Sequence, residues 1–473
     1  RENLPRHYSY EVRACLHRTK VFDTVLSTSM LVSELRANGV PIRAVRLQQE
    51  TLEWMSNTAC GRLHLRDRFK SRVLSPDSPG TFWKSQRYWK MRERLANLGI
   101  SVVSLVFTLL VLEVLLRCTH LFGACLSCSE PDEEIGYRFI PNCEYWHNRE
   151  NDHPIRGRMN NYGWRDDEWT LEKPENTYRV AVLGDSFVEA FQVELERTFL
   201  TLAEDELNRT SSISFELMAF GRSGFTQSEE LIVLQRDVLR FRPDVVMLFF
   251  FPGIGPTTCI RLVAPNKSRP FFHVSEDGQL VLDTSFSDTS EYKMRSRINY
   301  IKQRSALVSL ISNRYRTYQS NKREGKGKES GESSQPVSIN GFLSLCTSDP
   351  DEAYSRGYDL NKILIREIAG TCKSEGIEFV LVVMDNDAYL PVVEERYREI
   401  DSTFDPCFFE DDLRSYSEEL GVGFIGLQSI FRKDYETHGK ELHWGHWNYS
   451  GHELVARSLI DSLKAREPVS SGS

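Results

Sequence analysis

A serine stands directly after a short apolar segment, at a place where a nucleophile can act. The segment at 178–183 reads YRVAVL, and Gly184-Asp185-Ser186 follows it. A serine just past the end of a buried strand can expose its hydroxyl, and the backbone N–H groups beside it can bind a developing oxyanion. Serine is also a common helix cap. Ser186 is therefore a candidate nucleophile whose role depends on a base elsewhere in the chain.

Three histidines gather within ten residues near the end of the chain. His443, His446 and His452 lie in LHWGHWNYSGH, just before a segment with helical spacing. An imidazole takes a serine proton near neutral pH and returns it to a leaving group, so this loop is the expected source of the base. The sequence contains no GxGxxG, Walker or HExxH motif, so we expect neither a cofactor nor a metal ion.

The elements that must bring Ser186 and these histidines together alternate along the chain. Such alternation of strands and helices predicts an α/β fold, a three-layer α/β/α sandwich with a mostly parallel sheet, in one domain over 178–465. The carboxyl ends of the strands, where ligands bind in such sheets, then meet at one edge. We expect strands at 178–183, 214–219, 245–251, 379–384 and 422–427, and helices at 197–208, 227–240, 354–373, 391–400, 411–420 and 451–464.

Three regions do not follow this alternation. Residues 118–177 are rich in aromatic and turn residues and form the expected irregular lead-in to the domain. The pattern breaks again at about 260–350, which we interpret as an insertion in the same domain. Within it, residues 320–337 are polar and of low complexity, which predicts a flexible loop.

The most apolar stretch of the chain precedes the lead-in. Residues 98–116 read LGISVVSLVFTLLVLEVLL and carry one charge, Glu113. As a helix this stretch spans about 28 Å, close to the ~30 Å hydrocarbon core of a bilayer. We predict a transmembrane signal anchor over 98–117; a buried core helix is the alternative. Basic residues precede it and the acidic run SEPDEE follows at 129–134, which predicts a single-pass protein of the cytoplasmic membrane with its large domain outside.

Charge is distributed unevenly about this stretch. The chain has a net charge of −8, which argues against a nucleic-acid partner. Residues 1–100 carry 18 Lys and Arg against 9 Asp and Glu, and the rest of the chain carries 41 against 58.

Residues 1–90 contain no motif. We expect Met91 to be the true start of the protein, and we expect the segment before it, if real, to be cytoplasmic. Cys125 and Cys128 form a CxxC without two more ligands, so we interpret them as interfacial thiols or a disulfide, not a zinc site.

Taken together, the motifs resemble the SGNH (GDSL-like) hydrolase superfamily. GDSF follows the first strand, GRSGF the second, and HWNYSGH precedes the last helix. NNYGWR at 160–165 and FRPDVVMLFFF at 241–251 resemble its bacterial membrane-anchored branch, in which one helix precedes the hydrolase domain. The resemblance implies an SGNH/flavodoxin-like fold, Ser186 as nucleophile and His446 as base. It also implies that the N–H groups of Ser186 and Gly224 bind the oxyanion, and that His452 is a packing residue.

Two positions depart from the family pattern. Ile254 stands where the family has an Asn that donates to the oxyanion, and the loss of one such donor costs about 10²–10³ in rate. The family's acid lies two or three residues before the base, where this chain has Trp444 and His443. His443 is the candidate orienter of the base, and a backbone carbonyl is another. The sequence selects none of the remaining candidates, Asp185, Asp385, Asp434 and Glu441.

These features support two principal hypotheses. The first is a membrane-anchored, extracytoplasmic serine esterase or O-acyltransferase that acts on an ester of a cell-envelope glycan or a lipid. Aromatic residues expected around the site favour the glycan (Trp164, Phe187, Phe225, Trp444 and Trp447). The alternative is a catalytically impaired SGNH-fold domain that binds such a glycan or a partner protein. A third, a signalling or structural membrane protein, rests on residues 1–90 alone. The sequence predicts no oligomeric state.

Overall fold

The computed structural model describes residues 79–119, 127–147, 150–151, 153–258, 260–261, 264, 266–315, 318, 339 and 341–466. The expectations for most of the N-terminal segment 1–90 and for the loop at 320–337 fall on residues outside these ranges.

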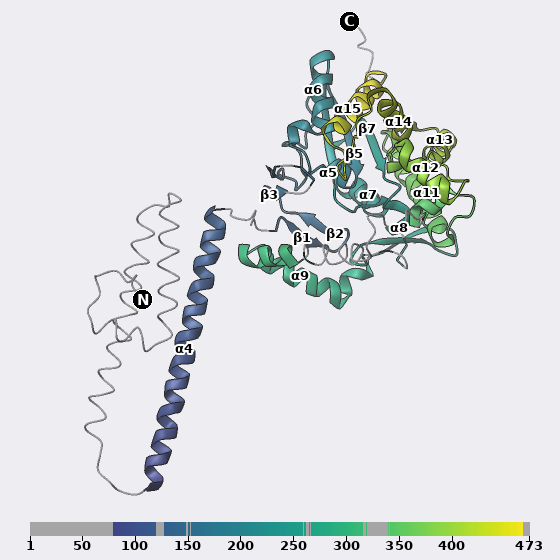
Figure 1. Ribbon diagram of the computed structural model, residues 1–473. Coiled ribbons are helices and arrows are strands. Elements are labelled where there is room, and N and C mark those ends of the chain that lie inside the picture. The colour runs from purple at the N-terminus through teal and green to yellow at the C-terminus, as the bar shows by residue number, and fades with distance from the viewer. Residues whose placement is uncertain are drawn as a thin grey trace. The chain divides into compact units, whose positions relative to one another are not determined.

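A five-stranded parallel sheet forms the centre of the domain (Figure 1). Its strands follow the order β11-β10-β7-β5-β6, and every neighbouring pair is parallel. The central strand β7 is a continuous apolar run, VVMLFF, that is buried on both sides, whereas half of the edge strand β11 is only half-buried. The predicted three-layer α/β/α fold with a mostly parallel sheet is therefore confirmed. The strands are β5 (Thr177–Gly184), β6 (Ser214–Gly221), β7 (Val245–Phe250), β10 (Glu378–Val383) and β11 (Gly423–Gly426).

Helices cover both faces of this sheet, because successive strand residues point to opposite sides. Val180 and Val182 pack in one apolar core with α6 (Phe199–Thr210), α14 (Leu427–His438) and α15 (Tyr449–Lys464). Ala181 and Leu183 pack in the other core, with the helices α7 (Gln227–Val233), α11 (Glu352–Ser374), α12 (Pro391–Ile400) and α13 (Phe408–Leu420). The predicted helix at 227–240 differs from the structure, in which α7 gives way to a π-helical turn at Leu234–Val238.

The lead-in at 118–177 is more regular than expected. It contains two antiparallel hairpins, one of β1 (Ser129–Asp132) and β2 (Gly136–Phe139), the other of β3 (Glu144–His147) and β4 (Ile155–Arg158). Four-residue strands are too short to give a periodic pattern in the sequence. A disulfide joins Cys128 to Cys143 across these hairpins, so Cys128 is paired outside the expected CxxC, whose Cys125 lies outside the described residues.

The insertion after β7 also contains regular structure. A four-residue helix, α8 (Gly255–Thr258), comes first, and the hairpin of β8 (Phe271–Val274) and β9 (Leu280–Asp283) follows. The 13-residue helix α9 (Ser290–Lys302) then runs beside β1 (Figure 1). A further helix covers residues 306–315.

The apolar stretch before the domain lies in one long helix, α4 (Pro79–Thr119). Within it, Tyr88–Cys118 is long and apolar enough to cross a membrane, and its most apolar window is not buried by other parts of the protein. The alternative of a buried core helix does not fit this exposure.

Candidate active site

The nucleophile candidate stands at the junction of β5 and a short helix. β5 ends at Gly184, Asp185 caps α5 (Ser186–Glu189), and Ser186 is the first residue of that helix. The Asp185 carboxylate accepts a hydrogen bond of 2.9 Å from the N–H of Phe187, which fixes the turn. The Ser186 N–H lies in the first turn, where a helix offers no intrahelical acceptor, so it is available to a ligand. A side chain at Gly184 would meet Val188 at 2.4 Å, so the tight turn requires glycine there.

His446 and Ser186 meet across 260 residues of sequence. The Nε2 atom of His446 lies 2.8 Å from Oγ of Ser186. The loop that carries His446 is narrow, because His443 and Trp447 form a β-bridge and the N–H of Trp444 donates to the carbonyl of His446 at 2.8 Å. The structure thus brings together the two residues whose types and places in the sequence suggested a nucleophile and a base.

A carboxylate from the lead-in completes this arrangement. Both oxygens of Glu150 lie 3.0 Å from Nδ1 of His446, and Oε2 also accepts from the backbone N–H of His446 at 2.9 Å. Glu150 follows the second-hairpin strand β3 and has a positive φ of 70°. The order Ser186–His446–Glu150 has the geometry of a nucleophile, a base and an orienting acid.

Electrostatics favour protonation of this histidine. Burial alone would lower the pKa of His446, but the hydrogen bond and charge of Glu150, with Asp185 and Glu189 nearby, raise it above its usual value. For Glu150, burial raises the pKa, and the contacts with His446 outweigh this and lower it. A Glu150 carboxylate that stays ionised holds the Nδ1 proton of His446 in place, which leaves Nε2 free to accept the proton of Ser186.

His443, the candidate orienter from the sequence, faces away from His446. Its Nε2 lies 2.7 Å from Oδ2 of Asp385, a fully buried carboxylate just after β10, and the indole N–H of Trp447 donates to the other oxygen at 2.9 Å. The β-bridge between His443 and Trp447 aims both side chains at Asp385. The half-buried His443 and the buried Asp385, which was also a candidate acid, therefore pair with each other.

The remaining candidate acids do not contact His446 through a hydrogen bond. Asp185 caps α5, and Asp434 pairs with His438. The backbone carbonyl of Glu441 accepts a hydrogen bond from the side chain of Asn448. Burial raises the pKa of Asp185 to about 6.

The turn after β6 presents its second glycine close to the nucleophile's helix. Gly224 has a φ of 79°, a conformation that favours glycine. Glu189, at the end of α5, accepts hydrogen bonds from the hydroxyl and N–H groups of Ser223, and Arg269 donates to the carbonyl of Gly224 at 2.9 Å. The N–H of Gly224 donates to no acceptor among the described residues, so it is available to an oxyanion.

Buried charges hold this turn. Burial raises the pKa of Glu189 to about 7, and the same effect lowers the pKa of Arg222 to about 10. Arg222 donates to the carbonyl of Tyr137 at 3.0 Å and stacks over Trp164 at 4.3 Å. The turn is thereby tied to the first hairpin of the lead-in.

The side chain at the family's Asn position offers no hydrogen bond. Ile254 lies in the turn between β7 and α8, and its N–H donates to the carbonyl of Phe251 at 3.3 Å. The backbone N–H groups of Ser186 and Gly224 remain the candidate oxyanion donors.

Other candidates from the sequence lie in the core. His452 is fully buried: its Nδ1 accepts from the N–H of Phe199 at 3.2 Å and its Nε2 lies 3.1 Å from Nε2 of Gln192. Burial lowers its pKa to about 3, so it is neutral and packs the start of α15. The aromatic residues expected around the site are buried apart from Trp444, which is 41% exposed; the buried ones are Trp164, Phe187, Phe225 and Trp447.

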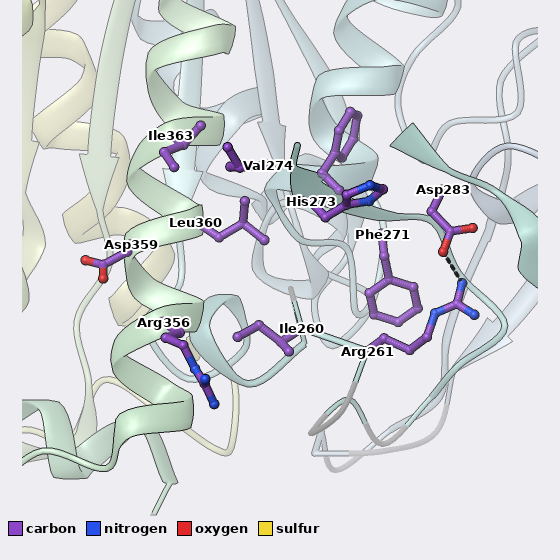
Figure 2. A pocket seen from close by; sticks show the side chains of 11 residues that line it. Ile260, Arg261, Phe271, His273, Val274, Asp283, Arg356, Asp359, Leu360 and Ile363 are labelled. Carbon is purple, nitrogen blue, oxygen red and sulfur yellow. Dashed lines mark hydrogen bonds and ion pairs between the residues drawn. The ribbon is translucent and has the colours of Figure 1, made fainter. Parts of the chain in front are cut away.

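A cavity of about 450 Å³ lies elsewhere, between the β8–β9 hairpin and α11 (Figure 2). Phe271 and Leu360 face it, and Arg261 at its rim pairs with Asp283 at 2.8 Å. Neither Ser186 nor His446 lines it. Among the described residues, no group of three or more His, Cys, Asp or Glu side chains is arranged to hold a metal ion.

Comparisons with known proteins find similarity only at the level of structure. No protein-family model matches the chain, and no curated protein matches it. An acetyl xylan esterase, AlAXEase, is similar over 60% of this chain and 99% of its own, with 13% identity and a TM-score of 0.33. LAE5, an alpha/beta hydrolase enzyme from the metagenome of Lake Arreo, is similar over 62% of this chain and 97% of its own, with 15% identity and a TM-score of 0.34. A protein of the G-D-S-L family from Desulfitobacterium hafniense is similar over 60% of this chain and 98% of its own, with 12% identity and a TM-score of 0.28.

Proposed function

We propose that the domain is a serine-dependent carboxylic ester hydrolase or acyltransferase in which Ser186 is the nucleophile, His446 the base and Glu150 the positioning acid. The observation that carries the proposal is the continuous hydrogen-bond chain from Ser186 Oγ through both nitrogens of the His446 ring to the Glu150 carboxylate. A serine without such a base is a poor nucleophile at neutral pH.

The reaction follows from these contacts. Oγ of Ser186 attacks the ester carbonyl carbon while Nε2 of His446 accepts the hydroxyl proton. The tetrahedral oxyanion forms within reach of the Ser186 and Gly224 N–H groups and then collapses. The leaving alcohol takes the proton from Nε2, which leaves an acyl ester on Ser186. Water, or the hydroxyl of an acceptor, then gives its proton to Nε2 of His446 and attacks the acyl carbon. The second tetrahedral intermediate collapses as the bond between the acyl carbon and Oγ of Ser186 breaks, and Oγ takes the proton back from Nε2. The acid or the new ester then leaves.

Two features bear on the alternative of an impaired, glycan-binding or protein-binding domain. The lack of an acid near His446 in the sequence favoured it, and Glu150 now supplies an acid from the lead-in. Ile254 still leaves the site one side-chain donor short of the family pattern, which lowers the expected rate by about 10²–10³. A slow enzyme fits both observations.

The placement outside the cytoplasm rests on two observations. α4 contains a segment able to cross a membrane, with basic residues before it and an acidic run after it. The disulfide between Cys128 and Cys143 lies just beyond this segment, and disulfides persist in oxidising compartments. An ester of an envelope glycan or a lipid is the substrate class that such an anchored domain reaches.

Turnover of p-nitrophenyl acetate by the full chain in detergent micelles tests the proposal. We expect Ser186→Ala and His446→Ala each to reduce kcat/KM by at least about 10³-fold. The exposed residues Ser212 and His438 supply matched controls, and Ser212→Ala and His438→Ala should leave kcat/KM unchanged. Equal turnover by wild type and Ser186→Ala would refute the proposal.

A further inference from the structure

The outer face of α9 carries an apolar stripe. Met294, Ile298 and Ile301 follow the spacing of one helix face, and their exposed fractions are 57%, 44% and 49%. The opposite face packs on the domain, where Tyr292 is buried and Ser296 and Asn299 are half-buried. The stripe is therefore an apolar surface that the domain itself leaves uncovered.

Basic residues flank this stripe. On a helical wheel Lys293 and Arg297 lie on one side of it and Arg295 on the other. Residues 290–315 contain six Lys or Arg and one Glu, a net charge of +5 in a chain whose net charge is −8. An apolar stripe with a cationic border is typical of a helix that lies on an anionic lipid surface.

The same segment is attached to the membrane-spanning helix. The carboxylate of Glu113 accepts hydrogen bonds from the Ser305 hydroxyl at 2.8 Å, the Ala306 N–H at 2.8 Å and the Leu307 N–H at 3.0 Å. Glu113 thus caps the 306–315 helix, which explains the one charge in the apolar stretch. Five residues separate it from Cys118, the end of the candidate span, which is a depth of about 8 Å. Interfacial helices sit about 5–10 Å into the boundary of a bilayer.

Exposed tyrosines occur along the same segment. Tyr300 is 57% exposed, and the Arg304 guanidinium lies over its ring at 3.5 Å. Beyond Arg304, Ile311, Tyr315 and Tyr318 repeat the i, i+4, i+7 spacing, and each is about 60% exposed. Tyrosine is enriched at the membrane–water interface, where its ring sits in the headgroup layer.

We propose that residues 290–318 form a lipid-binding surface that lies on the outer leaflet and recognises anionic phospholipid headgroups. The inference rests on the anchor in the proposed function. Its consequence is that the domain is held by two attachments, α4 and this surface, and not by a flexible tether. The Ser186 site is then kept at a fixed height above the bilayer, within reach of substrates embedded in or attached to it.

Photo-crosslinking to lipid tests this surface. The full chain is reconstituted in phosphatidylcholine nanodiscs with and without phosphatidylglycerol, each with a trace of a diazirine phospholipid, and mass spectrometry locates the adducts. We expect adducts on α4 in both lipids, and adducts on α9 that increase severalfold with phosphatidylglycerol. Ile298→Glu with Ile301→Glu should reduce the α9 adducts by about tenfold and leave those on α4 unchanged. Val392→Glu with Ile400→Glu on α12, which exposes its side chains equally but is bordered by glutamates, is the matched control and should change nothing.

The outcomes separate this inference from the anchor. Adducts on α4 without adducts on α9 would overturn the lipid-binding surface and leave the anchor standing. Crosslinks between two chains through α9, in place of lipid adducts, would also overturn it and would assign the stripe to a second copy. No adducts on either helix would refute the anchor and the surface together.

Discussion

Replacement of Glu150 by Gln tests the least expected part of the site. The amide keeps the size of the side chain but removes the charge that holds the Nδ1 proton of His446. Loss of a fully buried triad acid costs about 10⁴ in kcat. Glu150 is 24% exposed, so solvent screens part of its charge, and its backbone contact to His446 can persist in Gln. We therefore expect kcat/KM for p-nitrophenyl acetate to fall by about 10²–10³, or roughly 3–4 kcal/mol of transition-state stabilisation.

The pH profile separates this role from a merely structural one. Catalysis needs neutral His446, so kcat/KM rises with pH through the pKa of that ring. Because Glu150 raises the pKa of His446, its loss should move the acidic limb of the profile to lower pH while the plateau falls. Glu150→Asp should recover part of the rate. Glu441→Gln, on an exposed glutamate close to His446 in the sequence, is the matched control and should leave both rate and profile unchanged. A wild-type rate in Glu150→Gln, or a lower plateau with an unmoved limb, would refute the triad.

Three further predictions concern the supports of the site. Cys128→Ser with Cys143→Ser removes a disulfide whose cysteines are 15 residues apart, which should lower the free energy of unfolding in urea titrations by about 3 kcal/mol. It should also reduce kcat/KM, because the segment that carries Glu150 becomes looser. An unchanged kcat/KM would contradict this link between the disulfide and the position of Glu150. Asp385→Asn removes the buried charge that pairs with the half-buried His443 ring, and it should cost about 3 kcal/mol of stability without moving the pH limb of His446. A shifted limb would place Asp385 in the catalytic chain. Burial lowers the pKa of His452 to about 3, so the unfolded chain binds a proton there that the folded chain rejects, and stability present above about pH 6.5 is lost as pH falls towards 3. His452→Gln should flatten this loss by up to about 1.4 kcal/mol per pH unit, and an identical slope in urea midpoints would count against a buried neutral ring.

Local sequence patterns were sufficient to predict the parallel sheet and two residues of the candidate site, Ser186 and His446. The apolar runs at β5 and β7 predicted their strands to within one residue at each end, because a buried parallel strand leaves a continuous apolar signal. Ser186 and His446 each sit in a short motif next to such an element, so their meeting followed from the topology of a parallel sheet.

The acid could not be predicted in the same way. Glu150 lies 296 residues from His446 in the sequence and belongs to hairpins of four-residue strands, which no periodicity reveals. Its position depends on the tertiary fold of the lead-in and on its positive φ. His443, the predicted orienter, is only three residues from His446, but its ring hydrogen-bonds to Asp385 instead. The β-bridge between His443 and Trp447 turns the ring in that direction.

Covalent labelling of Ser186 tests the central claim most directly. The full chain in detergent is incubated with a fluorophosphonate probe, and the modified residue is identified by mass spectrometry of the digested protein. We predict one adduct on Ser186 that is absent from His446→Ala and forms more slowly in Glu150→Gln, because the probe reacts only with a serine activated by its base. A folded wild-type protein that takes no label, or takes it on another serine, would contradict a working Ser186–His446–Glu150 site.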